Sequence, residues 1–138
     1  MFDALDLVNQ GLADPPLPVS NSDPALIEAK KTRALAIRAM CATQIESGFV
    51  SAALGSKTFY PSDAASQLNT ASVAVCGGWL WCQEANGLWS MIHHTVPQGM
   101  QVRADLAAHI QTQQLRHAER LRTIMGASDV TAVNAVVW

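Results

Sequence analysis

The sequence predicts an α+β fold: two antiparallel β-hairpins forming a small sheet packed against helices, with a long C-terminal helix and a short final helix. Two observations support this prediction. First, two runs of aromatic and β-branched residues each double back across a glycine-containing turn. Second, the segments around them carry apolar residues at helical spacing, with capping residues before and glycines after. Because no βαβ unit joins the hairpins, we expect an antiparallel sheet with helices on one side.

Composition limits the class of protein. The chain has 138 residues, of which 49% are hydrophobic and 14% charged, which suits one folded domain and argues against disorder. A net charge of −2 gives no basic footprint for nucleic acid or an anionic membrane. The start of the chain does not resemble a signal peptide, and no segment approaches the roughly 20 apolar residues of a membrane helix. We therefore expect no nucleic-acid and no membrane partner.

The three cysteines, Cys41, Cys76 and Cys82, include no CxxC pair. This odd number is typical of reduced thiols in a cytoplasmic protein, although a disulfide between two of them remains open.

Residues 1–22 differ from the rest and are predicted to form an extended, proline-rich N-terminal arm. An apolar start, Phe2–Val8, precedes Asp14–Pro18, where three prolines favour an extended path. The arm either takes part in assembly or is a tolerated leader. Residues 23–138 are predicted to form a single α+β domain.

The first helix is expected to begin at Asp23-Pro24, because Asp caps free amides and Pro suits the first helical position. Gly48 is expected to end it. Its apolar stripe is Ala34, Ile37, Cys41 and Ile45.

The first hairpin is predicted from Phe49–Leu54 and Lys57–Tyr60, with Gly55-Ser56 as a type II′ turn. In that register Ala52 faces Phe59 and Ser51 faces Tyr60. Pro61 is expected to stop the second strand.

The second helix is expected to be capped by Ser62, with Asp63 in its first turn and Gly77-Gly78 at its end. Its predicted buried stripe is Ala64, Leu68, Ala71 and Val75.

The second hairpin has the strongest turn signal in the chain. Asn86-Gly87 separates Trp79–Glu84 from Leu88–His94, and three of the four tryptophans lie there. A three-residue loop puts four large side chains on one face, whereas a two-residue loop divides them between faces. These four are Trp79, Trp81, Trp89 and Met91. The sequence leaves both registers open.

The long helix is predicted from a capping box at Thr95–Gln98 to Met125, with Gly126 as its stop. Its thirty or so residues would span roughly 45 Å, more than a domain of this size covers. Polar Gln113 and His117 interrupt its apolar stripe, which comprises Val102, Leu106, Ile110, Leu121 and Ile124. The pattern favours a projecting helix that meets a second copy of the chain, and a kink or a second short helix is the alternative.

The last helix is predicted to be capped by Ser128-Asp129. Val130, Val133 and Val137 are expected on one side of it, and terminal Trp138 is expected to be packed.

No pattern indicates catalysis, a metal site or a cofactor. Neighbouring His93 and His94 would point to opposite faces of a strand, so they cannot easily share one metal. His109 and His117 are two helical turns apart. Glu84 and Asp63, the acids nearest the hairpins, have no second acid at motif spacing, and no nucleotide-binding or hydrolase motif occurs. We therefore predict that the protein is not an enzyme.

The order of landmarks from residue 25 to 138 resembles one known family. These landmarks are Gly48-Phe49, Ala53-Leu54-Gly55, Tyr60-Pro61-Ser62, Asp63, Gln67-x-Asn69, Gly87-Leu88-Trp89, His94-Thr95 and Trp138. The family is the domain of unknown function at the C-terminal end of phage and prophage tail-fibre assembly proteins. Its Trp-x-Cys step is matched only in part, because Trp81 and Cys82 are adjacent.

The resemblance implies a phage or prophage protein of tail or tail-fibre morphogenesis, acting by protein–protein binding, with a tail or tail-fibre protein as partner. It implies no catalytic residues. The cytoplasm of the bacterial host, or the virion tail, is the expected location. The alternative is a small-ligand or nucleic-acid binding module that uses the aromatic hairpin. The candidate interaction surface comprises Tyr60, Trp79, Trp81, Trp89, Met91, His93, Gln113, His117 and Leu121.

Overall fold

The computed structural model describes residues 23–138, and the predicted arm at residues 1–22 lies outside the described part. Its helices and antiparallel sheet confirm the α+β class. In this part of the chain no helix is both long enough and apolar enough to span a membrane.

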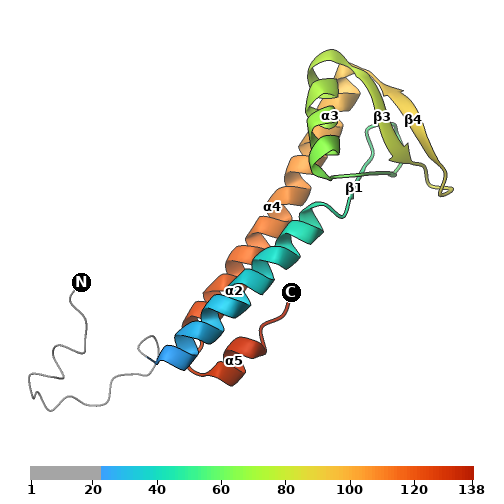
Figure 1. Ribbon diagram of the computed structural model, residues 1–138. Coiled ribbons are helices and arrows are strands. Elements are labelled where there is room, and N and C mark those ends of the chain that lie inside the picture. The colour runs from blue at the N-terminus through green and yellow to red at the C-terminus, as the bar shows by residue number, and fades with distance from the viewer. Residues whose placement is uncertain (1–22) are drawn as a thin grey trace, which may run out of the picture.

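Two long helices lie side by side and run in opposite directions (Figure 1). They are α2 (Pro24–Ile45) and α4 (Val96–Gly126), and together they form what we call the stalk. At one end of the stalk, α3 (Ala64–Cys76) and the sheet form what we call the head. At the other end, α5 (Val130–Asn134) folds back beside α2.

The sheet has four antiparallel strands in chain order, β1-β2-β3-β4. The strands are β1 (Phe49–Ser51), β2 (Thr58–Tyr60), β3 (Gly78–Gln83) and β4 (Trp89–His94). One face packs against α3 and α4, and the opposite face is open to solvent.

The first hairpin exists, but its predicted register is wrong by two residues. Phe49 pairs with Tyr60 and Ser51 with Thr58, so residues 52–57 form the loop. The loop closes on itself instead of extending the ladder, because the Gly55 amide donates to the Ala52 carbonyl at 2.9 Å. A shift by two leaves every side chain on its expected face.

The second hairpin adopts the three-residue loop Ala85-Asn86-Gly87. The Glu84 amide donates to the Leu88 carbonyl at 2.9 Å, and the Gly87 amide donates to the Glu84 carbonyl at 2.8 Å. Gly87 has a φ of 88°, which this type of loop requires at its last position. Of the two registers open from sequence, this is the one that places the large side chains on one face.

Helix α2 begins as predicted, with the Asp23 carboxylate accepting from the Ala25 amide, and it buries Ile37 and Cys41. Helix α3 differs from the prediction, since Asp63 is its cap rather than Ser62. The Ser62 hydroxyl instead donates to the Ile45 carbonyl at 2.6 Å and accepts from the Gly48 amide at 2.8 Å. It therefore ties the end of α2 to the head.

The predicted buried stripe of α3 is also wrong, because Leu68 and Val75 are 73% and 68% exposed. The buried residues are Thr70, Val73 and Ala74. The reason is the close approach of two helices at Gly99 of α4, where an added Cβ would lie 2.6 Å from the Val73 carbonyl oxygen. This contact turns the Val73 side of α3 toward α4.

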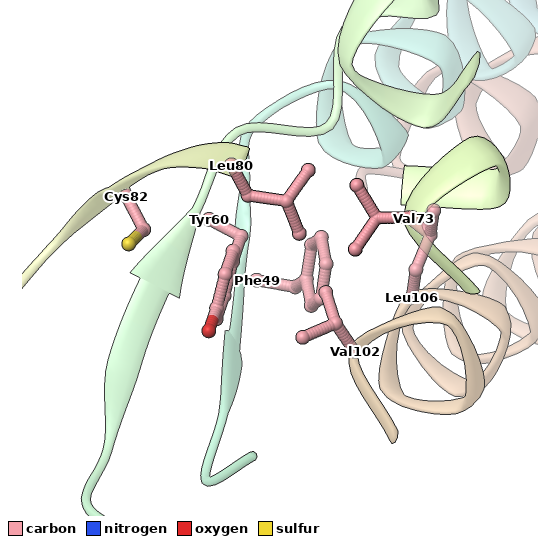
Figure 2. Packing of buried hydrophobic residues seen from close by; sticks show 7 residues of the cluster. All are labelled: Phe49, Tyr60, Val73, Leu80, Cys82, Val102 and Leu106. Atoms are coloured by element: carbon pink, nitrogen blue, oxygen red, sulfur yellow. The ribbon is translucent and has the colours of Figure 1, made fainter. Parts of the chain in front are cut away.

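Buried apolar residues gather in two clusters at opposite ends of the molecule. The head cluster joins the covered face of the sheet to α3 and α4, as Figure 2 shows. It comprises Phe49, Tyr60, Val73, Leu80, Cys82, Val102 and Leu106. The base cluster joins α2, α4 and α5, and it comprises Leu26, Ile37, Ile124, Val133 and Val136.

The long helix carries the predicted capping box at Thr95 and Gln98 and extends through Gly126, one residue beyond its predicted end. Asp129 caps α5, as expected. The predicted stripe of the last helix is partly wrong, since Val137 lies beyond the end of α5 and is 64% exposed, while its neighbour Val136 is buried. Trp138 packs against the base cluster.

Candidate interaction surface

The open face of the sheet gathers the large side chains of the second hairpin. Side chains alternate across a strand, so the odd-numbered residues of β3 and β4 share one face. Trp79 is 60% exposed and Trp81 is 49% exposed. Trp89, Met91 and His93 are exposed beside them. Five of the predicted surface residues therefore lie together.

Ring contacts order this face into one layer. The Trp81 and Trp89 rings stack with centroids 5.7 Å apart, and Trp79 meets His93 edge to face at 5.4 Å. Phe59 of β2 extends the layer by an edge contact with Trp89 at 5.9 Å. We call this surface the aromatic face, and it comprises Val50, Phe59, Trp79, Trp81, Trp89, Met91 and His93.

Backbone geometry positions Phe59. Its ring lies on Gly48, where an added Cβ would come within 2.1 Å of the ring. Gly48 has a φ of 96°, which favours glycine. Sequence reasoning missed Phe59 and Val50 because it treated the two hairpins separately. Strand alternation puts Phe59 and Tyr60 on opposite faces, so placing Tyr60 on the interaction surface assigned Phe59 to the wrong side.

Tyr60, predicted to belong to the interaction surface, lies in the core with 1% of its surface exposed. Its hydroxyl lies 2.8 Å from Nε2 of buried His94, while Nδ1 of His94 lies 2.8 Å from the Ile92 carbonyl. Because a carbonyl only accepts, Nδ1 donates to Ile92, and Nε2 is bonded to the Tyr60 hydroxyl. Burial raises the pKa of Tyr60, with smaller contributions from Cys82 and Asp105.

A pocket of about 90 Å³ opens beside the aromatic face, where β2 and β3 diverge. The pocket is lined by Trp79, Trp81 and Met91 of the sheet and by polar side chains from the first half of α3. These groups include Ser66, Asn69 and Thr70. The pocket has room for one side chain of a partner.

The predicted surface residues of the long helix lie elsewhere. Gln113 and His117 are half-buried, and Leu121 packs against the base cluster. The Cys41 thiol of α2 donates to the Gln113 carbonyl at 3.6 Å. Helix α2 of the same chain covers this stripe of α4. The polar residues Gln113 and His117 within the stripe therefore do not need a second copy of the chain to explain them. Self-association through α4 remains a prediction.

The side chains of His93, His94 and His109 lie apart from one another and do not form a site. His93 is exposed and His94 buried, which confirms that they point apart. His109 Nε2 donates to the Gln44 and Ile45 carbonyls, at 3.0 and 3.1 Å, and so caps α2. Within residues 23–138, no three His, Cys, Asp or Glu side chains gather in a metal-binding arrangement.

The three cysteines are free thiols, so the disulfide left open from sequence does not form. Cys41 and Cys82 are buried, and burial raises the pKa of both thiols, whereas Cys76 is exposed.

The aromatic face is therefore the feature of the described chain best suited to binding. Comparison with known proteins adds no family, since no family model, curated protein or solved structure matches this chain.

Proposed function

We propose that this protein is a phage or prophage tail-associated assembly protein of the tail-fibre assembly type, which binds another protein through the aromatic face. The proposal is supported by the sequence resemblance and by where its landmarks lie. Gly48 supports Phe59, Ser62 ties the head to α2, and Gly87 closes the loop that aligns the tryptophans. These three landmarks contribute to the head, while a fourth, Trp138, packs on the base cluster.

The observation that carries the binding role is the exposed apolar area. At about 250 Å² per indole ring, the exposed fractions of Trp79, Trp81 and Trp89 amount to roughly 370 Å². That already reaches the range of about 300–600 Å² for the largest apolar patch of a typical monomer. Met91 and Val50, both about half exposed, enlarge it toward the roughly 800 Å² that each partner buries in a standard interface.

The chemistry of the face favours an apolar protein partner. Strands β1–β4 contain no lysine or arginine, whereas surfaces that stack nucleobases usually lie in a positive groove. An aromatic protein surface with a pocket for one side chain is typical of an interface anchor. Such a surface suits a chaperone that covers apolar fibre surface until the fibre trimerises. We propose that it acts in the cytoplasm of the bacterial host, with incorporation into the virion tail as the alternative.

The test is co-purification with the tail-fibre protein encoded beside this one. We expect the unmodified chain to capture the fibre protein and a Trp79→Ser/Trp81→Ser variant to lose it. The matched control is Leu35→Ser/Leu115→Ser, which removes two similarly exposed apolar side chains from the stalk and should leave capture unchanged. Failure of the unmodified chain to bind any neighbouring tail protein would count against the proposal.

One observation favours the alternative of a small-ligand site, namely the pocket between two tryptophans and three polar side chains. Its volume of about 90 Å³ is below the roughly 150 Å³ of a cavity that admits benzene, and far below typical ligand pockets of about 300–1,000 Å³. Titrating tryptophan fluorescence with sugars and oligonucleotides should therefore give no quench at micromolar ligand. A saturable quench would favour the alternative.

A further inference from the structure

Strand β4 is an edge strand of the sheet, and its outer backbone groups have no neighbouring strand in the described part of the chain. In the strand order β1-β2-β3-β4, no strand within residues 23–138 pairs with that edge. Figure 1 shows β4 at the side of the head that lies away from the stalk. The opposite margin is β1, which is only three residues long, whereas β4 has six.

The direction of the free backbone groups follows from the loop. In an antiparallel pair, residues alternate between those bonded to the facing strand and those whose amide and carbonyl point away. Glu84 bonds to Leu88, so the bonded residues of β4 are the even-numbered ones. The amides and carbonyls of Trp89, Met91 and His93 therefore point to the open edge.

Proteins usually protect such an edge with charges, proline, a bulge or a covering element. Strand β4 reads Trp-Ser-Met-Ile-His-His, with no lysine, arginine or proline. Its pairing with β3 runs without a bulge from Gly78–His94 to Gln83–Trp89. An exposed and unprotected strand of this length is suited to pairing with another strand.

We propose that β4 pairs antiparallel with β4 of a second copy of this chain, about a two-fold axis at Met91. This register pairs five of the six residues of β4, because Trp89 then faces His93 of the second copy and Ser90 faces its Ile92. It also uses the free groups, since all three outward-pointing residues become bonded members of the new ladder. A second copy is the occupant because β4 is complementary to itself in this register.

The side chains agree with this register. Paired residues belong to the same face of each chain, so the two aromatic faces join into one continuous surface. Trp89 opposite His93 of the second copy repeats a pair that the hairpin already contains, since Trp79 meets His93 at 5.4 Å. This inference rests on the edge of β4 and not on the proposed fibre partner.

The size of the contact sets its expected strength. The five paired residues of each strand meet over about 17 Å. This contact is at the small end of specific interfaces, so we expect a dissociation constant on the order of micromolar. The chain should therefore change from monomer to dimer within an accessible concentration range.

The first test uses the unmodified full chain. Sedimentation analysis from about 1 μM to about 1 mM should show a monomer–dimer equilibrium. Amide-resolved hydrogen exchange over the same range should show concentration-dependent protection at Trp89, Met91 and His93. The amides of Ser90, Ile92 and His94 should change little, because they are bonded within the hairpin at every concentration.

The second test compares two substitutions at one position. Met91→Pro removes the outward amide without removing a bond to β3, while Met91→Val loses the thioether but keeps that amide. Because the two-fold axis doubles each lost hydrogen bond, Met91→Pro should weaken the dimer by about 100-fold. Met91→Val should change the dissociation constant less than about fivefold, since its backbone still pairs.

Two results would overturn the proposal: a chain that stays monomeric throughout this range, or a dimer whose three outward amides exchange as fast as in the monomer. If Met91→Pro does not fold, the exchange data on the unmodified chain decide alone. Fibre capture by a folded, monomeric Met91→Pro variant is a separate readout, because Trp79 and Trp81 remain. Whether this variant loses or keeps fibre capture tests the proposed function, and neither outcome alters the conclusion about the dimer.

Discussion

The head and the stalk use tryptophan in opposite ways. In the head, Trp79, Trp81 and Trp89 stand on the open side of a sheet whose other side covers the core. At the base of the stalk, Trp138 packs on the base cluster, with the Arg116 guanidinium 5.6 Å from its ring centroid. The fold therefore packs one indole against a core and leaves three on an open face, which fits a binding role for those three.

The head and the stalk each have a buried cluster of their own, and a few hydrogen bonds form a joint that connects the two regions. The head cluster and the base cluster occupy opposite ends of the stalk, and α4 contributes to both. Where α2 meets the head, Ser62 and His109 bond to the last carbonyls of α2. This joint and the continuity of α4 lead us to expect that the head and stalk unfold together.

The largest expected effect comes from removing the central ring of the head cluster. Phe49 is 5% exposed and stacks on Tyr60 with centroids 5.6 Å apart. Phe49→Ala should lower the free energy of unfolding by about 3–5 kcal/mol, since it loses buried area and leaves a cavity. Urea titration should be followed by tryptophan fluorescence, which reports mainly on the head, and by far-ultraviolet circular dichroism, which reports mainly on the long helices.

We expect both signals to shift together, as in a two-state transition. If fluorescence shifts while the helical signal keeps its midpoint, the head and stalk are separate cooperative units. Such a result would contradict the role assigned to the joint.

A smaller effect is expected from the backbone beneath the aromatic face. Gly48 and Gly55 have nearly the same φ, 96° and 94°, but only Gly48 lies against a ring. Gly55→Ala should cost about 1–2 kcal/mol in free energy of unfolding, from conformation alone. Gly48→Ala should cost more, because the Phe59 ring must also move. If both variants lose the same free energy of unfolding in urea titrations, the Phe59 contact with Gly48 does not contribute to the difference.

Much of this architecture was predictable because its signals are local. Asp23, Thr95 and Asp129 cap their helices as predicted, and Gly48 and Gly77 follow the ends of theirs. Five residues of the aromatic face were also identified, although strand alternation alone left their register open. The bonds around Ala85-Asn86-Gly87 decide that register, and such bonds depend on the folded loop.

The errors arose where distant segments meet. The buried side of α3 is set by the approach of Val73 to Gly99, which no periodicity within α3 reveals. Ser62 was predicted as a cap and instead bonds to Ile45, a residue of the preceding helix. The stripe of α4 lies against α2 of the same chain, a contact that the pattern of α4 alone did not reveal, while self-association through α4 stays a prediction.

The third prediction concerns the alkaline limit of the head. Burial raises the pKa of Tyr60, so the folded state keeps the phenol proton at pH values where the unfolded chain, with a pKa of about 10, has lost it. The stability gained from the protonated phenol is complete below pH 10 and is lost as pH rises toward the folded pKa. The free energy of unfolding should fall by up to about 1.4 kcal/mol per pH unit above pH 10.

The measurement is direct because Tyr60 is the single tyrosine of the chain. Tyrosinate absorbance should stay absent in the folded protein above pH 10 and appear with unfolding. The Tyr60→Phe variant should lose this alkaline slope. A folded protein that titrates at an ordinary tyrosine pKa would show that the Tyr60–His94 pair is open to water.

The smallest expected effect is at the start of α3, on the solvent side of the head. The hydroxyl of Ser66 bonds to the Asp63 carboxylate and, with nearby amides, lowers the pKa of Asp63. A lowered pKa adds stability that is present above the unfolded value of about 3.9 and is lost as pH falls through the folded value. Asp63→Asn keeps a capping side chain, so its urea midpoint at neutral pH should be close to that of the unmodified chain. Between pH 4 and pH 2 the variant should lose slightly less stability. An identical acid dependence would mean that the charge of Asp63 does not contribute to stabilising the start of α3.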